Sequence, residues 1–428
     1  MSTKKNPFHV AIVGGGLGGI ALAIALKHRN ISFTVYEAKQ SFTEIGAGIN
    51  LGPTASQSLR LIEPSLGEKY MKLATPNPPP NEETWMLFRY GAPSGDHKDG
   101  DLMFQLKAPG TGNLTFHRQE LLQLMATEMG TEHAKFNKKF SSYEQNEDGV
   151  TIRFAGGSEE TASLLIGCDG IHSRVRTAMF GENNAVSSPH FSHAGLYRKV
   201  VPMEQAIEAI GESARVSQIV HGPGGYLITY PVSGGKMMNC GAWQLVPEQW
   251  PIDEWLLPGQ KSRFEEGFKD WGERSKKILA LFDADPALWG SFQHIQQPKS
   301  FYDGRVLLIG DGAHGMPPHQ GSGAGQAVED AYVLSEVLSV MQERGPSSEV
   351  VKAGMQAFEA VRKPRSAEVH RLSSITGPRF CEVYDQKLEG QELDDWICLT
   401  KKRLRSIWSV DMAGEAEKAR EELSRALG

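Results

Sequence analysis

The sequence predicts an α/β protein that also contains a second, sheet-rich domain and a helical C-terminal region. Three observations predict it. The chain begins with a strand, a glycine turn, a helix and a second strand; strand-like segments separated by glycine turns follow from about residue 187; and the sequence beyond about residue 350 is charged and helical. The predicted segments are the first part of the α/β domain at 1–186, the sheet-rich domain at 187–298, the second part of the α/β domain at 299–375 and the helical region at 376–428.

The first βαβ unit is the clearest local pattern. Val10–Val13 is short and apolar, the turn 14–19 holds five glycines in six residues, and Ile20–Lys27 is rich in helix formers. A second strand, Phe33–Tyr36, ends at Glu37, which gives about the length of one βαβ unit.

The remaining elements follow from hydrophobic periodicity and turn residues. Proline and glycine predict loops at 76–80 and 92–112, and we expect an oligomer contact or helical packing for the C-terminal end, which includes the helix 415–427. The other predicted elements are helix 118–129, a hairpin over 143–154 with a turn at 146–149, strand 163–166, strands 195–201, 217–220, 226–232 and 237–244, strand 305–309 and a helix from about 324 to 342.

Composition excludes several classes of protein. The 428 residues are 40% hydrophobic and 22% charged, which favours folded cores over disorder, and a net charge of −6 argues against a nucleic-acid partner. Cys168, Cys240, Cys381 and Cys398 lie far apart without a C-x-x-C pair, so neither a zinc knuckle nor a disulfide framework is expected. We therefore expect a reduced, cytoplasmic protein.

The uncharged stretch 10–26 after Lys4 and Lys5 superficially resembles a secretory leader. Its five glycines would break the helix that such a leader needs, so the glycine turn is the better interpretation. The other apolar runs fall short of the ~18 residues that span a bilayer, and no membrane span is expected.

Gly14, Gly16 and Gly19 form a G-x-G-x-x-G pattern between a strand and a helix. In that context the first glycine permits a tight turn, the second lets a pyrophosphate approach the backbone, and the third permits close helix packing. Glu37 offers a carboxylate to a ribose diol and would repel a 2′-phosphate, which favours FAD or NAD over NADP.

Four blocks of sequence resemble the single-component FAD-dependent aromatic hydroxylases, and within them the salicylate-hydroxylase-like branch and its fungal phenol-hydroxylating or dearomatising members. They are the glycine turn with Glu37, the block 44–49 (EIGAGI), the block 168–176 (CDGIHSRVR) and the block 310–318 (GDGAHGMPP). The resemblance implies that 1–186 and 299–375 form a Rossmann-like FAD-binding domain and that 187–298 is the substrate domain. Two departures are Gly312, where alanine is common, and Thr54, where relatives usually have asparagine and where flavin edge contacts would change.

The resemblance also implies the residues that hold the cofactor. Asp311 would contact the ribityl hydroxyls of FAD, Arg118 would reach the bound nucleotide, and Asp169 would lie near the pyrophosphate and the NAD(P)H docking site. From the residues alone, Asp169 could instead cap the following helix and Arg118 could be a surface charge. The remaining cofactor-binding candidates are Gly48 and, at a helix N-terminus near the flavin ring, Gly323 and Ala324.

On the substrate side, Arg198 resembles the arginine that holds phenolates in fungal relatives, and Tyr230 resembles a tyrosine that borders the substrate. Strand alternation places Tyr226 on the same face, so it is the alternative to Tyr230. His221 could carry a proton, although a surface loop histidine is the favoured interpretation. His314 and His319 lack partners at coordinating spacing, so no metal site is expected.

The resemblance implies an FAD-dependent monooxygenase that uses NADH or NADPH and O₂ to hydroxylate a phenolic compound through a flavin C4a-hydroperoxide. Ring hydroxylation, decarboxylative hydroxylation of a salicylate-type acid and dearomatisation of a polyketide phenol share these residues. A flavin oxidase or dehydrogenase of the same fold is the alternative, followed by a non-catalytic FAD-binding protein. A monomer or homodimer is expected.

Overall fold

The computed structural model describes residues 8–43, 48–251, 254–295 and 298–428. One layer is a six-stranded sheet in the order β18-β19-β11-β1-β2-β7, parallel except for the β18–β19 pair. Residues 10–13 of strand β1 are all apolar, as expected where both faces of the sheet are covered, and residues 10–12 are fully buried. The strands are β1 (His9–Val13), β2 (Ser32–Tyr36), β7 (Ala134–Lys135), β11 (Leu164–Gly167), β18 (Tyr302–Asp303) and β19 (Val306–Leu308).

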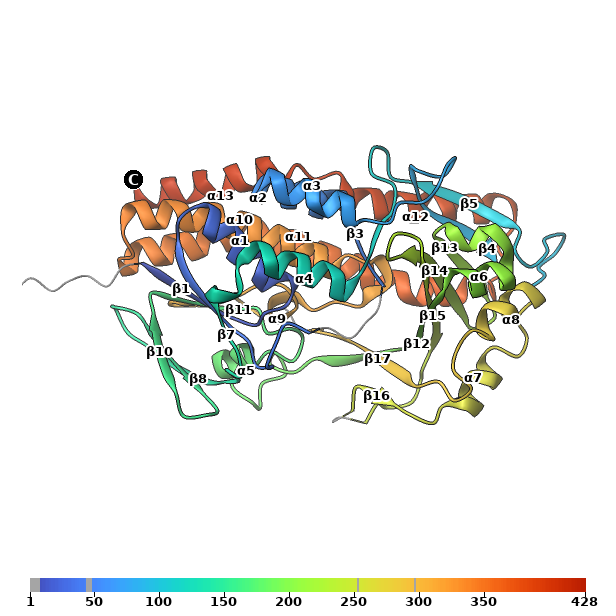
Figure 1. The fold of residues 1–428 in the computed structure, drawn as a ribbon, viewed down its shortest axis with the longest axis horizontal. Coiled ribbons are helices and arrows are strands. Elements are labelled where there is room, and N and C mark those ends of the chain that lie inside the picture. Colours follow the sequence, from blue (N-terminus) through green and yellow to red (C-terminus); the bar gives the residue numbers. More distant parts are fainter. Residues whose placement is uncertain (1–7, 44–47, 252–253, 296–297) are drawn as a thin grey trace, which may run out of the picture.

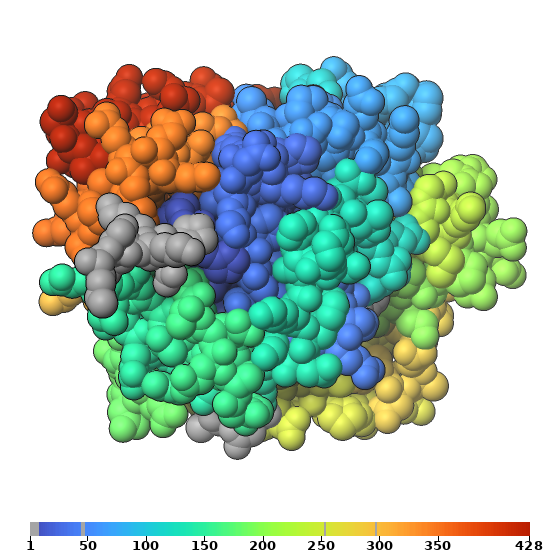
Figure 2. All heavy atoms as spheres, turned by 60° about the vertical axis from the view of Figure 1, so that its left-hand side comes forward, coloured from blue at the N-terminus to red at the C-terminus, as the bar shows by residue number. Residues whose placement is uncertain are grey.

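Long helices cover this sheet (Figure 1). Helix α1 (Leu17–His28) packs against α4 (Arg118–Met129) and α10 (Gly323–Arg344), and α10 in turn packs against α11 (Ser348–Glu382) and α13 (Met412–Leu427). Helix α13 buries an apolar stripe against α10 and α11, so the C-terminal end is helical packing, one of the two roles expected for it. In the space-filling view the orange and red C-terminal helices lie beside the blue N-terminal segment (Figure 2).

The second layer is an eight-stranded sheet in the order β16-β17-β12-β15-β14-β13-β4-β5, drawn at the right of Figure 1. The four strands predicted between 195 and 244 are confirmed, the first as part of a longer strand. The sheet also includes β4 and β5 from an earlier part of the chain. Its strands are β4 (Thr84–Tyr90), β5 (Leu102–Lys107), β12 (His190–Pro202), β13 (Gln218–Gly222), β14 (Gly225–Val232), β15 (Met237–Leu245), β16 (Leu256–Leu257) and β17 (Leu288–Gln293).

The loop prediction for 92–112 is wrong in its second half, where β5 forms. Glycines at 100, 110 and 112 flank the strand and favoured the loop prediction. Between them is a short alternation in which Phe104 and Leu106 are buried and their neighbours are more exposed. Pairing with β4 satisfies one side of the backbone of this edge strand, which the composition of the segment does not reveal.

The smaller elements complete the fold. The hairpin predicted at 143–154 is confirmed as β8 (Phe140–Gln145) and β9 (Val150–Phe154), joined by β10 (Glu159–Ala162), and β3 (Gly48–Leu51) pairs with β6 (Leu114–His117). Within the described residues, no helix combines the length and apolar character that crossing a bilayer requires. The other helices are α2 (Pro53–Ile62), α3 (Pro64–Leu73), α5 (Arg174–Phe180), α6 (Met203–Ile210), α7 (Lys261–Gly267), α8 (Glu273–Leu279), α9 (Asp311–His314) and α12 (Gly390–Trp408), with short 3₁₀ turns η1 (Thr131–His133), η2 (Gly211–Arg215) and η3 (Pro318–Gln320).

Candidate active site

The glycine turn between β1 and α1 has the three properties expected of its pattern. Gly14 has φ +108°, and a Cβ there would overlap the carbonyl oxygen of Cys168. A Cβ at Gly19 would overlap the carbonyl oxygen of Gly14, so this glycine permits close packing. A Cβ at Gly16 has no protein atom within 4 Å, which leaves its face open at the helix N-terminus.

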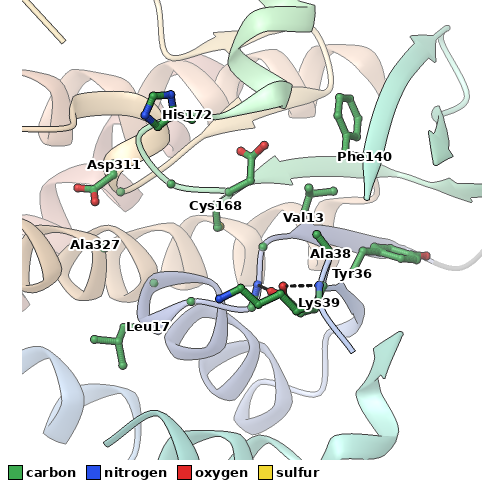
Figure 3. A pocket seen from close by; sticks show the side chains of 18 of the residues that line it. Val13, Leu17, Tyr36, Ala38, Lys39, Phe140, Cys168, His172, Asp311 and Ala327 are labelled. Atoms are coloured by element: carbon green, nitrogen blue, oxygen red, sulfur yellow. Dashed lines mark hydrogen bonds between the residues drawn. The ribbon is translucent and has the colours of Figure 1, made fainter. Parts of the chain in front are cut away.

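This open face borders a cavity of about 430 Å³, in which Figure 3 shows Leu17 and Lys39 on one side and Asp311 and His172 on the other. Glu37 lines the same cavity at the end of β2. Its carboxylate accepts hydrogen bonds from the backbone N–H groups of Gly15 and Lys39, each at 2.8 Å, and is therefore held in one orientation.

A second cavity of about 290 Å³ lies on the eight-stranded sheet. Its floor is one face of three adjacent strands, as period-two alternation requires, and apolar side chains such as Phe88, Met316 and Leu404 form much of the rest. The floor residues are Leu196 and Arg198 on β12, Asn239, Gly241 and Trp243 on β15, and Tyr226, Ile228 and Tyr230 on β14.

The two cavities meet at four residues that line both of them: Arg118, Asp311, Gly323 and Ala324. Gly323 and Ala324 form the N-terminus of the long helix α10, where free N–H groups and the helix dipole favour negative charge. A planar ring system placed at this junction would touch both the cavity beside the glycine turn and an apolar cavity with cationic groups.

A model of the family described as FAD binding domain matches residues 8–373. The chain belongs to this FAD-binding family. Its relatives include 6-methylsalicylate 1-monooxygenase of Aspergillus terreus, 34% identical over 96% of this chain and 91% of the relative, and salicylate hydroxylase of Pseudomonas putida, 32% identical over 99% and 97%. A solved salicylate hydroxylase substrate complex matches with a TM-score of 0.82 and 29% identity, covering 97% of this chain and 98% of that one.

The protein is therefore an FAD-dependent monooxygenase of the aromatic hydroxylase family, with FAD as cofactor and NAD(P)H and O₂ as the co-substrates typical of that family. The residues present fit FAD. Gly16 leaves the space that a pyrophosphate needs, and the fixed Glu37 carboxylate stands where it would accept hydrogen bonds from a ribose diol.

The structure of the hydroxylase places most of the predicted cofactor residues around the first cavity. Gly14, Gly16, Glu37 and Asp169 line it, as do the four junction residues, whereas Gly19 lies behind the turn. Gly48 lines the second cavity instead, and residues 44–47 of its sequence block lie outside the described residues.

Asp169 accepts hydrogen bonds at the start of the following helix, but the N-cap residue itself is Ser173, so the alternative interpretation holds only in part. Oδ2 of Asp169 accepts hydrogen bonds from the N–H groups of Arg174 (2.7 Å) and Val175 (3.2 Å), and its Oδ1 accepts from the hydroxyl of Ser173. Burial raises the pKa of this carboxyl group despite these bonds. Asp169 therefore fixes the Asp-Gly segment at the edge of the nucleotide cavity.

Both candidate tyrosines lie in the second cavity, but their hydroxyl groups differ. The Tyr226 hydroxyl hydrogen-bonds Nδ1 of His319 at 2.8 Å, and burial lowers the pKa of His319 to about 3, so this imidazole is neutral. The Tyr230 hydroxyl has no hydrogen-bond partner within the described part of the chain. Burial raises the pKa of Tyr230, which keeps it protonated although the positive charge of Arg198 opposes the shift.

A buried ion network behind Asp311 was missed by sequence reasoning. Asp330 of α10 accepts hydrogen bonds from the Gly310 N–H (2.9 Å), from Nε2 of His314 (2.6 Å) and from Nε of Arg362 (2.7 Å). Burial alone would raise the pKa of Asp330, but His314 and Arg362 hold it below the usual range. The network thus anchors the loop that carries Asp311.

Two other expectations need correction. His221 is not a surface loop histidine: it is completely buried on β13, where Nδ1 hydrogen-bonds the carbonyl oxygen of Phe380 (2.8 Å). Thr54 lines neither of the two cavities and is one of the groups that lower the pKa of the buried Glu329 on α10, so its effect is on helix packing. Gly312 would accept the methyl group of an alanine, because the nearest atom to a Cβ there is 3.4 Å away.

Proposed function

We propose that the enzyme hydroxylates a phenol of the salicylate or polyketide type in the second cavity. One observation supports this most directly. Arg198 and Tyr230 project from neighbouring parts of one sheet face into an apolar cavity, and that cavity meets the nucleotide cavity at Asp311 and the N-terminus of α10. A volume of about 290 Å³ lies at the small end for ligand sites, which favours a compact aromatic compound.

In this proposal the chain binds and polarises the phenol. Bound FAD, reduced by NAD(P)H, would activate O₂, which supplies the oxygen atom that is transferred. The guanidinium of Arg198 stabilises the phenolate oxygen, which makes the ring more electron-rich, and the protonated Tyr230 hydroxyl donates a second hydrogen bond to it. The apolar walls exclude water and so strengthen both interactions.

Cofactor retention is assigned to the residues around the first cavity. The N–H groups at the start of α1 would receive the pyrophosphate over Gly16, Glu37 would accept from the ribose, and Asp311 would accept from the ribityl chain. Arg118 and the N-terminus of α10 would face the flavin ring from the junction.

The cell compartment and assembly belong to the same proposal. All four cysteines are free, which supports a reducing compartment such as the cytoplasm. We propose a monomer or homodimer without a nucleic-acid partner, and sedimentation of the purified protein distinguishes the two assemblies.

The first experiment follows NADH and NADPH oxidation with and without salicylates and acyl-resorcinols and identifies products by mass. Substrate-dependent gain of one oxygen atom supports the proposal, and accompanying loss of CO₂ indicates decarboxylative hydroxylation. We expect Arg198→Ala to retain FAD, since Arg198 lies outside the nucleotide cavity, and to lose product formation by about 100-fold or more. Product formation at the wild-type rate in this variant would remove Arg198 from the substrate site.

A further inference from the structure

Asn239 lies on the floor of the second cavity and is bound at only one end of its side chain. It is 7% exposed, and its Oδ1 accepts a hydrogen bond from the Gly48 N–H at 2.9 Å. A backbone N–H can only donate, so the amide atom that faces Gly48 must be the oxygen. This bond fixes the orientation of the amide and leaves Nδ2, a donor of two hydrogen bonds, at the other end.

Nδ2 of Asn239 has no hydrogen-bond acceptor among the described residues. The atom is also not completely buried. Because the side chain lines the cavity, this donor is open to whatever the cavity holds. A ligand oxygen that replaced solvent at this nearly buried donor would gain a hydrogen bond that is screened from bulk water and therefore stronger.

The neighbours of Asn239 are the two residues already assigned to the phenol. Asn239 is paired directly with Tyr230 across β14 and β15, and Arg198 is paired with Gly241, two residues further along β15. Directly paired side chains lie about 4.5–5.5 Å apart at Cβ, and diagonal ones about 7–8 Å. Gly241 has no side chain, and the side chains of Ile228 and Leu196 lie 2.9 and 3.0 Å from where its Cβ would be, so the floor between the three donors is apolar.

The charges of the cavity favour a ligand with more than one acceptor oxygen. Within the described lining, the donors on the floor are a guanidinium, two tyrosine hydroxyls, an indole N–H and an amide, and the sole carboxylate is Asp311 at the junction with the nucleotide cavity. A phenolate oxygen held by Arg198 and Tyr230 leaves the amide of Asn239 for a second, adjacent oxygen.

We propose that Asn239 is a specificity-determining residue that donates a hydrogen bond from Nδ2 to an oxygen ortho to the phenolate of the substrate. The substrate class is then a phenol with an ortho carboxylate or acyl group. This assignment rests on the proposed function, because it takes the phenolate position from Arg198 and Tyr230.

Two variants separate the donor from the bond to Gly48. Asn239→Asp retains an oxygen that accepts from the Gly48 N–H but replaces the donor by an acceptor, whereas Asn239→Leu loses both. Two pairs of probes differ only in the ortho group: salicylate with phenol, and 2,4-dihydroxyacetophenone with resorcinol. Binding is measured from the change in flavin absorbance of the holoenzyme, with FAD content and melting temperature as controls for the fold.

We expect the wild-type enzyme to bind the ortho-substituted member of at least one pair more tightly. In Asn239→Asp that preference should fall by about 10-fold or more, the value of one hydrogen bond to a charged group, with FAD content unchanged. Asn239→Leu should lose the preference as well, which excludes an effect specific to the introduced carboxylate.

The outcomes separate the two proposals. If the wild-type enzyme shows the ortho preference and Asn239→Asp keeps it, the role of Asn239 is overturned while the proposed function stands. If the wild-type enzyme binds phenols without any ortho preference, the substrate class inferred here is wrong. If it binds neither pair, the proposed function fails together with the inference.

Discussion

Replacement of Asp330 by asparagine tests whether the buried ion network around Asp330 positions Asp311, the residue assigned to the ribityl chain of FAD. Asp330 and Glu329 are neighbours on α10 and both are fully buried against Arg362. Only Asp330 also binds the Gly310 N–H and the His314 side chain, which lie at the two ends of the short segment 310–314 that includes Asp311. Asp330→Asn therefore changes both the network and the loop, whereas Glu329→Gln changes the network alone.

The magnitudes follow from these contacts. Each variant leaves one carboxylate fewer beside the buried Arg362, which costs about 3–5 kcal/mol of unfolding free energy. Asp330→Asn in addition weakens a charge-assisted bond to the Gly310 N–H, a loss of about 1.5–3 kcal/mol. If that energy positions Asp311 for the cofactor, FAD should bind about 10-fold to 100-fold more weakly.

Flavin fluorescence titration of the apoprotein measures the FAD affinity of each variant, and urea unfolding measures stability. We expect a stability loss of about 3–5 kcal/mol in Glu329→Gln and a larger loss in Asp330→Asn, with weaker FAD binding in Asp330→Asn and a change of less than about 3-fold in Glu329→Gln. Equal FAD affinities in the two variants would refute the positioning role and leave the network as a source of stability only. Asp330 contributes this stability at neutral pH, and because its pKa is lowered in the folded state, the contribution is lost as the pH falls below about 4.

Two further predictions concern the glycine turn and the buried His221. Gly16→Ala should fold with the wild-type melting temperature but lose FAD, because its Cβ meets no protein atom within 4 Å and would fill the pyrophosphate space. Gly14→Ala should instead unfold more easily, since φ is +108° at this position and a Cβ would overlap the Cys168 carbonyl. Flavin content and melting curves check both variants, and full flavin content in Gly16→Ala would contradict the assignment of Gly16 to the pyrophosphate. Burial lowers the pKa of His221 to about 4, so the unfolded chain binds a proton that the folded chain excludes between pH 6.5 and 4, and stability should fall with pH over this range. His221→Gln should reduce that slope by about 1.4 kcal/mol per pH unit in urea unfolding at pH 6.5, 5.5 and 4.5, and an unchanged slope would show that His221 does not contribute.

The sequence predicted those parts of the fold in which local pattern and tertiary environment agree. The strand–turn–helix unit around Gly14 and the helix 118–129 have apolar spacing that matches their burial, and both are confirmed. The alternation over 226–230 likewise predicted that Tyr226 and Tyr230 share a face, and both line the second cavity. Periodicity suffices where one face of an element is covered along its whole length.

Residues whose role depends on distant partners were not predictable in this way. Glu329 and Asp330 stand inside the buried part of helix α10, residues 325–335, and two adjacent acids there signal buried partners, but Arg362 lies 32 residues beyond Asp330 and outside any motif. Asn239 carries no motif either. Its alternation with Gly241 and Trp243 was the available signal, because it placed an amide on the face that Tyr230 shares.

Gly48 shows why a motif can indicate a residue without indicating its contacts. The resemblance assigned it to the cofactor, yet its N–H donates to Asn239 and a Cβ there would overlap the ring of Tyr230. A glycine is needed at this position for close approach, since the start of β3 lies directly against two residues of the substrate floor. Strand β3 also pairs with β6, which leads directly into Arg118 at the cavity junction. Gly48, which the family pattern associates with the flavin, is therefore in direct contact with Tyr230 and Asn239, which are proposed to bind the substrate. A substitution on either side of this contact should change the geometry of the other side.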